Sequence, residues 1–418
     1  MRGALLPQML ELWQISKTQF GVLMSIYGIV HNIFYLALAW VQDRFSSRVL
    51  IPVNMVLGGC TTFFLGTTTD FLTLCFLFVM LSLWCEGAFW PAILSAVRRS
   101  TSDSNQGKIF GLLEGGRGGV ELFQNTMTVA LYTWLGYSVF GLEIAFKVNA
   151  VIMIILGVVS FFMLPRETLL KSGDDAQRAN REVTAGMRTT LRLPEVWLAG
   201  LTGFCVYMAY TSMPYFLTYL QDLYALPLIA ISIFGIISTS GGRITIALPA
   251  GFLADRYFGG ATAGIRFGLG AVALLCIVMV FLSLSASEGS TSTAWISMLT
   301  MMGLAVLLFF MRALYFAPFG EMGLPQRFSG SVLSVAAFLV YLPASFAYLL
   351  WGWLLDTYPG EEGYIYMFSS LAAVTGIGIF IAHHLKKRIA SGSASRIAAR
   401  IEILDQKLDL HGKEKTLF

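Results

Sequence analysis

Long apolar segments alternate with short polar connections along the whole chain, and this pattern predicts its elements. A helix needs about 20 mostly apolar residues to cross the roughly 30 Å hydrocarbon core of a bilayer. The ten-residue alternation of membrane β-strands is absent, so we expect helices, whose backbone hydrogen bonds are satisfied within each segment. The pattern predicts eleven spans, at residues 19–41, 50–67, 71–96, 108–135, 142–164, 196–221, 228–252, 265–285, 295–318, 331–355 and 364–384.

Composition excludes a soluble protein. Hydrophobic residues make up 56% of the 418 residues and charged residues only 12%, about half of the ~25% typical of soluble domains. A soluble enzyme or nucleic-acid-binding protein would lack the polar residues to cover its surface. The five cysteines lie in apolar runs, and the sequence shows no phosphate-binding loop, hydrolase motif or metal-ligand spacing. We therefore expect no enzymatic activity, no cofactor and no metal site.

The basic residues predict an orientation. If the connection 42–49 is placed in the cytoplasm, 22 of the 28 lysines and arginines fall on that side. Because short basic loops stay in the cytoplasm, we expect an integral protein of the bacterial inner (cytoplasmic) membrane with a cytoplasmic C-terminus.

The first 18 residues are too polar to span and lack the pattern of a signal peptide. They are predicted to form an external loop remnant, in which Ser16 and Gln19 make a capping box for the first span. A loop requires a preceding element, so we infer that one helix is missing before residue 1. A genuine eleven-span protein is the alternative.

The longest polar connection, 165–195, divides the spans into two groups and is interpreted as a cytoplasmic linker. It separates an N-terminal helical bundle, 19–164, from a C-terminal helical bundle, 196–384. The remaining residues, 385–418, form a cytoplasmic tail. Apolar residues at helical spacing predict a short amphipathic helix there, which lies on the membrane, binds a partner or is solvated.

Both halves carry one motif at equivalent positions. The first span ends in AWVQDRFSSR, and the seventh ends in GFLADRYFGG. Carboxylates in such a motif accept hydrogen bonds from a helix N-terminus or an arginine. We therefore predict a conformational latch, with loop capping plus cytoplasmic positive charge as the alternative. The latch residues are Asp43, Arg44, Arg48, Asp255 and Arg256.

These twin motifs resemble the G-x-x-x-D-R-x-G-R-R signature that follows helices two and eight of the major facilitator superfamily. The resemblance extends to the long central linker and the all-helical span pattern. It implies an all-α polytopic membrane protein with two six-helix bundles (6+6), here lacking the first helix, so that the eleven spans are family helices two to twelve. The copies depart from the signature at Ala39, which replaces its glycine, and at Ser47, which replaces a basic residue. The segments CEGAFWPAI and QGKIFGLLEGGRG are also similar to a YihN-like bacterial branch of this superfamily.

Ionisable residues at membrane depth are the candidates for substrate binding or coupling, because each costs at least a few kcal/mol there and usually lines a polar path. His31 and Arg243 each lie twelve residues before the aspartate of their motif. At 1.5 Å per residue both are about 18 Å from the cytoplasmic end, near the midplane where transporters built from repeats bind substrate. Glu86 and Arg312 occupy approximately corresponding positions in the two halves.

The remaining candidates differ in their alternatives. Arg117 lies between Glu114 and Glu121 at helical spacing, and a structural ion pair is its alternative role. Arg243 and Arg312 have no acidic residue in their own spans, which favours an anionic substrate, although Arg312 is also a gating candidate.

Glu86 and His31 are the proton-coupling candidates, because burial and neighbouring charges can move both groups into the physiological pH range. For His31 a satisfied core residue is the alternative. Aromatic residues that could line a cavity or simply pack are Tyr35, Trp90, Tyr207, Tyr210, Tyr215 and Tyr315.

Together these patterns predict a monomeric secondary transporter that moves a small organic solute, anionic in charge, across the inner membrane by alternating access. The expected partners are the lipid bilayer, the solute and a coupling proton or ion, and no nucleic acid. The alternative is an N-terminally truncated, non-transporting membrane protein or sensor of the same fold.

Overall fold

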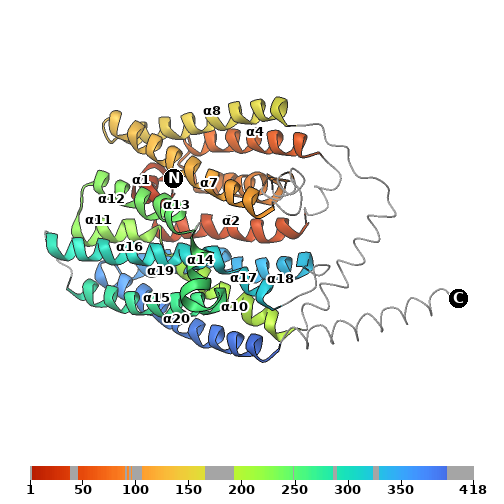
Figure 1. Ribbon diagram of the computed structural model, residues 1–418. Coiled ribbons are helices and arrows are strands. Elements are labelled where there is room, and N and C mark those ends of the chain that lie inside the picture. The colour runs from red at the N-terminus through yellow and green to blue at the C-terminus, as the bar shows by residue number, and fades with distance from the viewer. Residues whose placement is uncertain are drawn as a thin grey trace, which may run out of the picture.

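The computed structural model describes residues 2–37, 46–89, 92–93, 96, 106–164, 193–247, 249–285, 290–322 and 329–392. Regular secondary structure in these ranges is entirely helical. Most helices run roughly parallel. Those before the linker gather mainly on one side and those after it on the other, except that residues 228–246 lie beside the helices before the linker (Figure 1). We call these groups the N-half and the C-half.

The N-half contains five α-helices and one α-helix that continues into a π-helical turn. Their bounds are α1 Arg2–Trp13, α2 Lys17–Ala37, α4 Ser47–Leu65, α5 Phe71–Ser82, η1 Leu83–Phe89, α7 Gln106–Trp134 and α8 Val139–Met163. Within it, α4 packs along α8, and α2 packs against α5 and η1.

The C-half is divided into more helical segments than the N-half, because several of its helices are interrupted. Their bounds are α10 Pro194–Tyr210, α11 Tyr215–Tyr224, α12 Leu228–Ile236, η3 Ile237–Gly241, α13 Gly242–Ile246, α14 Ala250–Leu253, η4 Ala254–Phe258, α15 Ala261–Leu284, α16 Thr291–Leu314, α17 Ala317–Glu321, α18 Ser329–Tyr341, η6 Leu342–Ser345, α19 Ala347–Thr357 and α20 Glu361–Ala390. Here α15 packs along α20, and α10 packs against α18 and α20.

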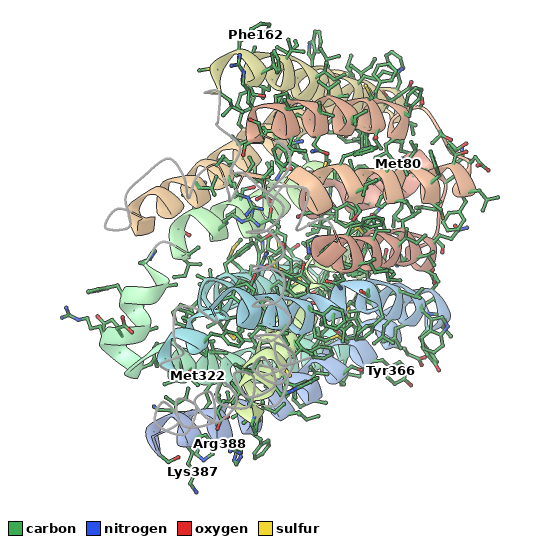
Figure 2. All side chains as sticks on the ribbon, turned by 90° about the vertical axis from the view of Figure 1, so that its right-hand side faces the viewer. Met80, Phe162, Met322, Tyr366, Lys387 and Arg388 are labelled. Carbon is green, nitrogen blue, oxygen red and sulfur yellow. The ribbon has the colours of Figure 1, made fainter. Side chains whose placement is uncertain are left out.

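Each of the eleven predicted spans coincides with helical structure. Eight helical segments in the described ranges are long and apolar enough to cross a membrane by length and composition, and Phe71–Glu86 is a shorter apolar helix. Large apolar side chains point away from the bundle, among them Phe162, 73% exposed, and Tyr366, 46% exposed (Figure 2). In water such a belt would be costly, but it suits a lipid environment.

The expectation of a loop over residues 1–18 is wrong for its larger part, because Arg2–Trp13 form α1. Its apolar side chains are buried against α8, α11 and α12. Two of its side chains donate hydrogen bonds inside the protein: the Gln8 amide donates to Ser232 Oγ at 3.3 Å, and Trp13 Nε1 donates to the Leu65 carbonyl at 2.8 Å. The mean hydropathy of a segment carries no information about such contacts with residues elsewhere in the chain.

The predicted capping box is confirmed. Gln19 N donates to Ser16 Oγ at 3.2 Å, and Ser16 N donates to Gln19 Oε1 at 3.0 Å. These reciprocal bonds satisfy two backbone donors at the start of α2, which fixes where the helix begins.

Two seams join the halves. In the first, α2 packs along α19 and η6. In the second, α1 packs against α11 and α12, and α7 packs against α12, η3 and α13. Glycine sets the closeness of the first seam: a Cβ on Gly28 would lie 2.3 Å from the carbonyl oxygen of Ala344, and one on Gly21 would lie 2.5 Å from that of Tyr348. Small residues allow helix backbones to approach this closely in membranes.

We expect Gly28→Ala to destabilise the protein by about 1–3 kcal/mol, because the new methyl group would overlap backbone atoms that cannot move away. The matched control is Gly119→Ala on α7, where an added Cβ meets nothing within 4 Å. Thermal unfolding of the purified protein in detergent should show a lower midpoint for the first variant only. Equal midpoints would contradict the close approach at Gly28.

Candidate functional site

Interruptions of the long helices have a local cause in the sequence. The helices α10, α16 and α18 each end shortly before a proline, namely Pro214, Pro318 and Pro343. Proline lacks the amide donor and its ring clashes with the carbonyl four residues earlier, so the helix breaks there. Elsewhere the chain forms π-helical turns, namely η1, η3 and η4. Breaks and π-turns of this kind recur at functional sites of membrane proteins.

The candidate residues lie at these interruptions. Glu86 belongs to η1, Arg243 is the second residue after η3, and Arg312 lies in the last turn of α16. Tyr210 and Tyr341 end α10 and α18, respectively. His31 and Arg117 differ, since they lie within the regular helices α2 and α7. Proline positions in the sequence carried part of this signal.

In the N-half, His31 and Glu86 form a pair. Their closest atoms, His31 Nδ1 and Glu86 Oε2, are 3.8 Å apart. The other carboxylate oxygen of Glu86 accepts a hydrogen bond from the Tyr27 hydroxyl at 3.2 Å. The structure thus brings together the two residues predicted for proton coupling, from two different helices.

Tyr341 connects this pair to the C-half. Its ring stands perpendicular to the His31 ring, with centroids 5.5 Å apart, and perpendicular to the Tyr207 ring at 5.1 Å. Its hydroxyl bonds to the Tyr315 hydroxyl at 2.9 Å. Asn32, next to His31, donates to Ser345 Oγ at 3.0 Å and reinforces the same contact. Sequence reasoning missed Tyr341, although its place two residues before Pro343 was a signal.

Arg312 is surrounded by tyrosines. Its guanidinium carbon lies 3.9 Å from the centroid of the Tyr210 ring and 5.7 Å from that of Tyr207, so cation–π attraction holds it. Its Nη1 is shielded from solvent and has no hydrogen-bond partner among the described residues. Tyr207, Tyr210 and Tyr315, proposed from the sequence as cavity candidates, therefore gather at one charge.

Arg243 is not without an acidic partner, as its own span had suggested. Its Nη1 forms an ion pair with Oε2 of Glu121 on α7, across the second seam. One helical turn away, the Asn125 amide donates to Ser240 Oγ at 3.1 Å. The helices approach closely because Gly118 has no side chain there: a Cβ would lie 2.8 Å from Ile244. A contact between spans cannot be read from spacing within one span.

Phe309 links the two arginines. The Arg243 guanidinium carbon lies 5.8 Å from its ring centroid, and the Tyr210 ring meets it edge-on at 6.1 Å. Arg117 lies on α7 one turn before Glu121 and is half-buried. Three of the five candidate substrate or coupling residues, His31, Arg243 and Arg312, are therefore connected through aromatic rings, and Glu86 joins them through His31.

Several of the other sequence candidates lie outside the part of the chain that the structure describes. Asp43 and Arg44 lie outside the described residues, as do the side chains of Tyr35, Glu114 and Trp90. Tyr215 donates to the Tyr348 carbonyl at 2.7 Å and serves packing.

Among the latch residues, Arg48 Nε donates to the Phe161 carbonyl at 3.0 Å, at the end of α8 in its own half. Asp255 and Arg256 lie exposed in η4, where Arg256 stacks beside Phe252 and Tyr257.

Glu321 has a role that the sequence did not suggest. Its carboxylate accepts hydrogen bonds from the Ala261 and Thr262 amides and from the Thr262 hydroxyl at the start of α15. A negative charge at a helix N-terminus satisfies backbone donors and the helix dipole. In the C-half, this capping function, which we had considered for the motif aspartate, thus belongs to Glu321.

This architecture defines a class of membrane protein: two helical halves meeting along two seams, with charged residues at broken helices between them. Residues 2–323 match the family model described as Major Facilitator Superfamily, and the chain belongs to that superfamily. Its members are transporters, so the protein is a membrane transporter by family and not an enzyme.

Comparisons with individual proteins support this assignment. The chain is 24% identical over 401 residues to the inner membrane protein YihN of Escherichia coli, covering 96% of this chain and 94% of the relative. It is 25% identical over 390 residues to the inner membrane protein YqcE of E. coli, covering 91% and 88%. Among solved structures, the nucleoside transporter NupG superposes with a TM-score of 0.68 at 13% identity, covering 92% and 94%, which shows a shared fold.

The ion pair across the second seam predicts energetic coupling. We expect Glu121→Gln and Arg243→Gln each to lower the thermal midpoint, and the double variant to lose less than their sum, because neither charge is then left unpartnered. A double-mutant cycle by thermal unfolding should give a coupling energy of about 1 kcal/mol or more. The control cycle uses Glu143 and Lys147, an ion pair within α8, for which about 0.3–0.5 kcal/mol is expected. Additive losses at Glu121 and Arg243 would show that the pair contributes nothing.

Proposed function

We propose that the protein is a secondary active transporter that moves a small organic anion across the bacterial inner membrane by alternating access, with its C-terminus in the cytoplasm. The observation that carries the anion is the state of Arg312. A guanidinium nitrogen that is buried without a hydrogen-bond partner is unfavourable, and an anionic ligand would supply that partner.

The surroundings of Arg312 suit a carboxylate or another oxyanion. Tyr210 stacks on the guanidinium, which leaves the donors in its plane to bind two oxygens of one group, the geometry that arginine provides best. The hydroxyls of Tyr315 and Tyr341 lie on neighbouring rings and add neutral donors. Aromatic faces there would contact the carbon skeleton of the solute.

The position of the site supports transport rather than static binding. Arg312 and its tyrosines belong to the C-half, whereas His31 and Glu86 belong to the N-half and meet them through Tyr341. A solute bound here contacts both halves, and a rocking motion of one half against the other would expose it to each side in turn. At the cytoplasmic end, we propose that Asp43, Arg44, Arg48, Asp255 and Arg256 act as the latch.

Coupling to protons follows from the same contact. An anion approaches Arg312 at lower cost when Glu86 is protonated or His31 is charged, because both changes remove net negative charge nearby. By linkage, the bound anion then favours protonation of the pair. We therefore propose proton coupling through Glu86 and His31, with Arg243 and Arg117 contributing to the electrostatics of the path.

Arg312→Ala should raise the concentration for half-maximal uptake about 10- to 100-fold, because hydrogen bonds to a charged group contribute about 1.5–3 kcal/mol. Proteoliposomes are tested with labelled carboxylates, phosphate monoesters and sulfonates, and with neutral solutes of similar size. Arg266→Ala, an arginine at the start of α15 that contacts His383, is the control and should match the wild type. Uptake of neutral solutes only, or unchanged uptake by Arg312→Ala, would refute the anion site.

Glu86→Gln should separate exchange from proton-driven accumulation. A residue that carries the coupling proton is needed to concentrate solute with a pH gradient, but not to exchange solute across the membrane at equilibrium. We expect loss of gradient-driven uptake with retained exchange, and normal behaviour for Glu143→Gln. Wild-type accumulation by the Glu86 variant would exclude this carboxylate as the coupling group.

A further inference from the structure

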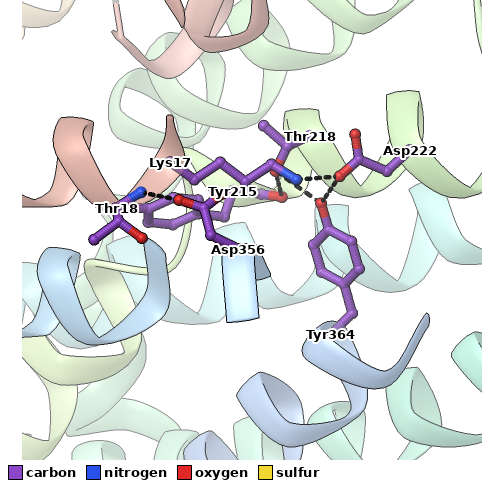
Figure 3. Close-up of polar contacts among 7 residues, drawn as sticks. All are labelled: Lys17, Thr18, Tyr215, Thr218, Asp222, Asp356 and Tyr364. Carbon is purple, nitrogen blue, oxygen red and sulfur yellow. Dashed lines mark hydrogen bonds and ion pairs between the residues drawn. The ribbon is translucent and has the colours of Figure 1, made fainter. Parts of the chain in front are cut away.

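A cluster of polar contacts joins the halves at one end of the bundle, where α2 and α20 begin and α11 and α19 end (Figure 3). We call it the Lys17 end. The charge distribution of the sequence predicts that this end faces outward. Its members are Lys17 and Thr18 from the N-half, and Thr218, Asp222, Asp356 and Tyr364 from the C-half.

Asp222 is the centre of the cluster. One of its carboxylate oxygens pairs with Lys17 Nζ and also accepts a hydrogen bond from the Tyr364 hydroxyl at 2.7 Å. The Tyr364 hydroxyl lies 2.9 Å from Thr218 Oγ1, and its ring centroid is 5.8 Å from Lys17 Nζ. An isolated surface ion pair contributes little, but this pair is partly buried and held in place by a buried tyrosine, so it is more ordered.

Asp356 makes a second contact of the same kind. Its carboxylate accepts a hydrogen bond from Thr18 N at 2.6 Å, at the first turn of α2, where amide donors lack partners within the helix and the helix dipole is positive. Two carboxylates of the C-half therefore hold the start of α2. Asp222 pairs with the side chain of Lys17, and Asp356 accepts a hydrogen bond from the backbone of Thr18.

Backbone packing closes the space beneath these contacts. A Cβ on Gly352 would lie 2.2 Å from the Lys17 carbonyl oxygen, so α19 touches the first turn of α2 directly. Gly21, one turn further along α2, meets the backbone at Tyr348. No solute can pass between α2 and α19 while these contacts persist.

We propose that Lys17, Asp222 and Tyr364, with Thr18 and Asp356, form the lock that keeps the Lys17 end closed in this conformation. His31 lies fourteen residues after Lys17 along the same helix, about 21 Å deeper. Opening the candidate site toward the Lys17 end requires α2 to separate from α11, α19 and α20, and hence these contacts to break. The strength of the lock therefore sets the equilibrium between the two access states.

The experiment measures opening directly and uses no substrate, so its failure is distinguishable from failure of the proposed function. Spin labels are attached to cysteines at Thr69 in the N-half and Glu362 in the C-half, both exposed and at the Lys17 end, after the five native cysteines are replaced. Pulsed electron–electron double resonance in lipid nanodiscs then gives the distribution of distances between the two spin labels.

We expect one short-distance population in the otherwise unmodified protein. Lys17→Gln and Asp222→Asn should each increase a longer-distance population about fivefold or more. Lys17→Arg should retain the closed distance, and the exchange of charges in Lys17→Asp combined with Asp222→Lys should recover most of it. Lys147→Gln, which removes the ion pair within α8, is the matched control and should leave the distribution unchanged.

Two results would overturn the lock: a wild-type distribution in both Lys17→Gln and Asp222→Asn, or an equal shift in the Lys147 control. If Asp222→Asn does not yield folded protein, Lys17→Gln and Asp356→Asn provide the same test, because Asp356 binds α2 independently of Asp222. Size-exclusion profiles and thermal midpoints establish folding before the distances are compared.

Discussion

Buried charge is the constraint on which the rest of this structure depends. A charged side chain at bilayer depth needs an opposite charge, an aromatic face or water beside it. Glu121 forms an ion pair with Arg243, Glu86 lies beside His31, and Tyr210 stacks on Arg312. The pair of Arg243 and Glu121 reaches across the interface, so neutralising charge and joining the halves are one interaction. Arg243 or Glu121 without its partner would be unfavourable in lipid.

Broken helices place these groups where they can meet. Prolines after α10, α16 and α18 and the π-turns η1 and η3 interrupt regular α-helical hydrogen bonding. Tyr341 shows the result, since it contacts His31 in one half and Tyr207 in the other. Rigid segments on either side of each break keep the contact ordered.

Much of the fold could be predicted from the sequence, because hydropathy, loop charge and the repeated Asp-Arg motif each act over a whole span. Helical structure occurs in the described part of each of the eleven predicted spans, and the capping box at Ser16 and Gln19 is present. The segment 1–18 was misjudged, because the polar residue Gln8 finds its partner, Ser232, far along the chain. For the site, the sequence found each charged candidate but not its partner, since the partners come from other spans.

By itself, the sequence determined that this is an all-helical membrane protein, and which ionisable residues lie within its apolar segments. These properties depend on local composition and on spacing along one helix. Tertiary structure alone decided that Glu121 serves Arg243, that tyrosines enclose Arg312, that Glu321 caps α15, and that Asp222 and Asp356 hold α2. Each of these joins residues far apart in the chain, and only the packing of one helix against another fixes their distance.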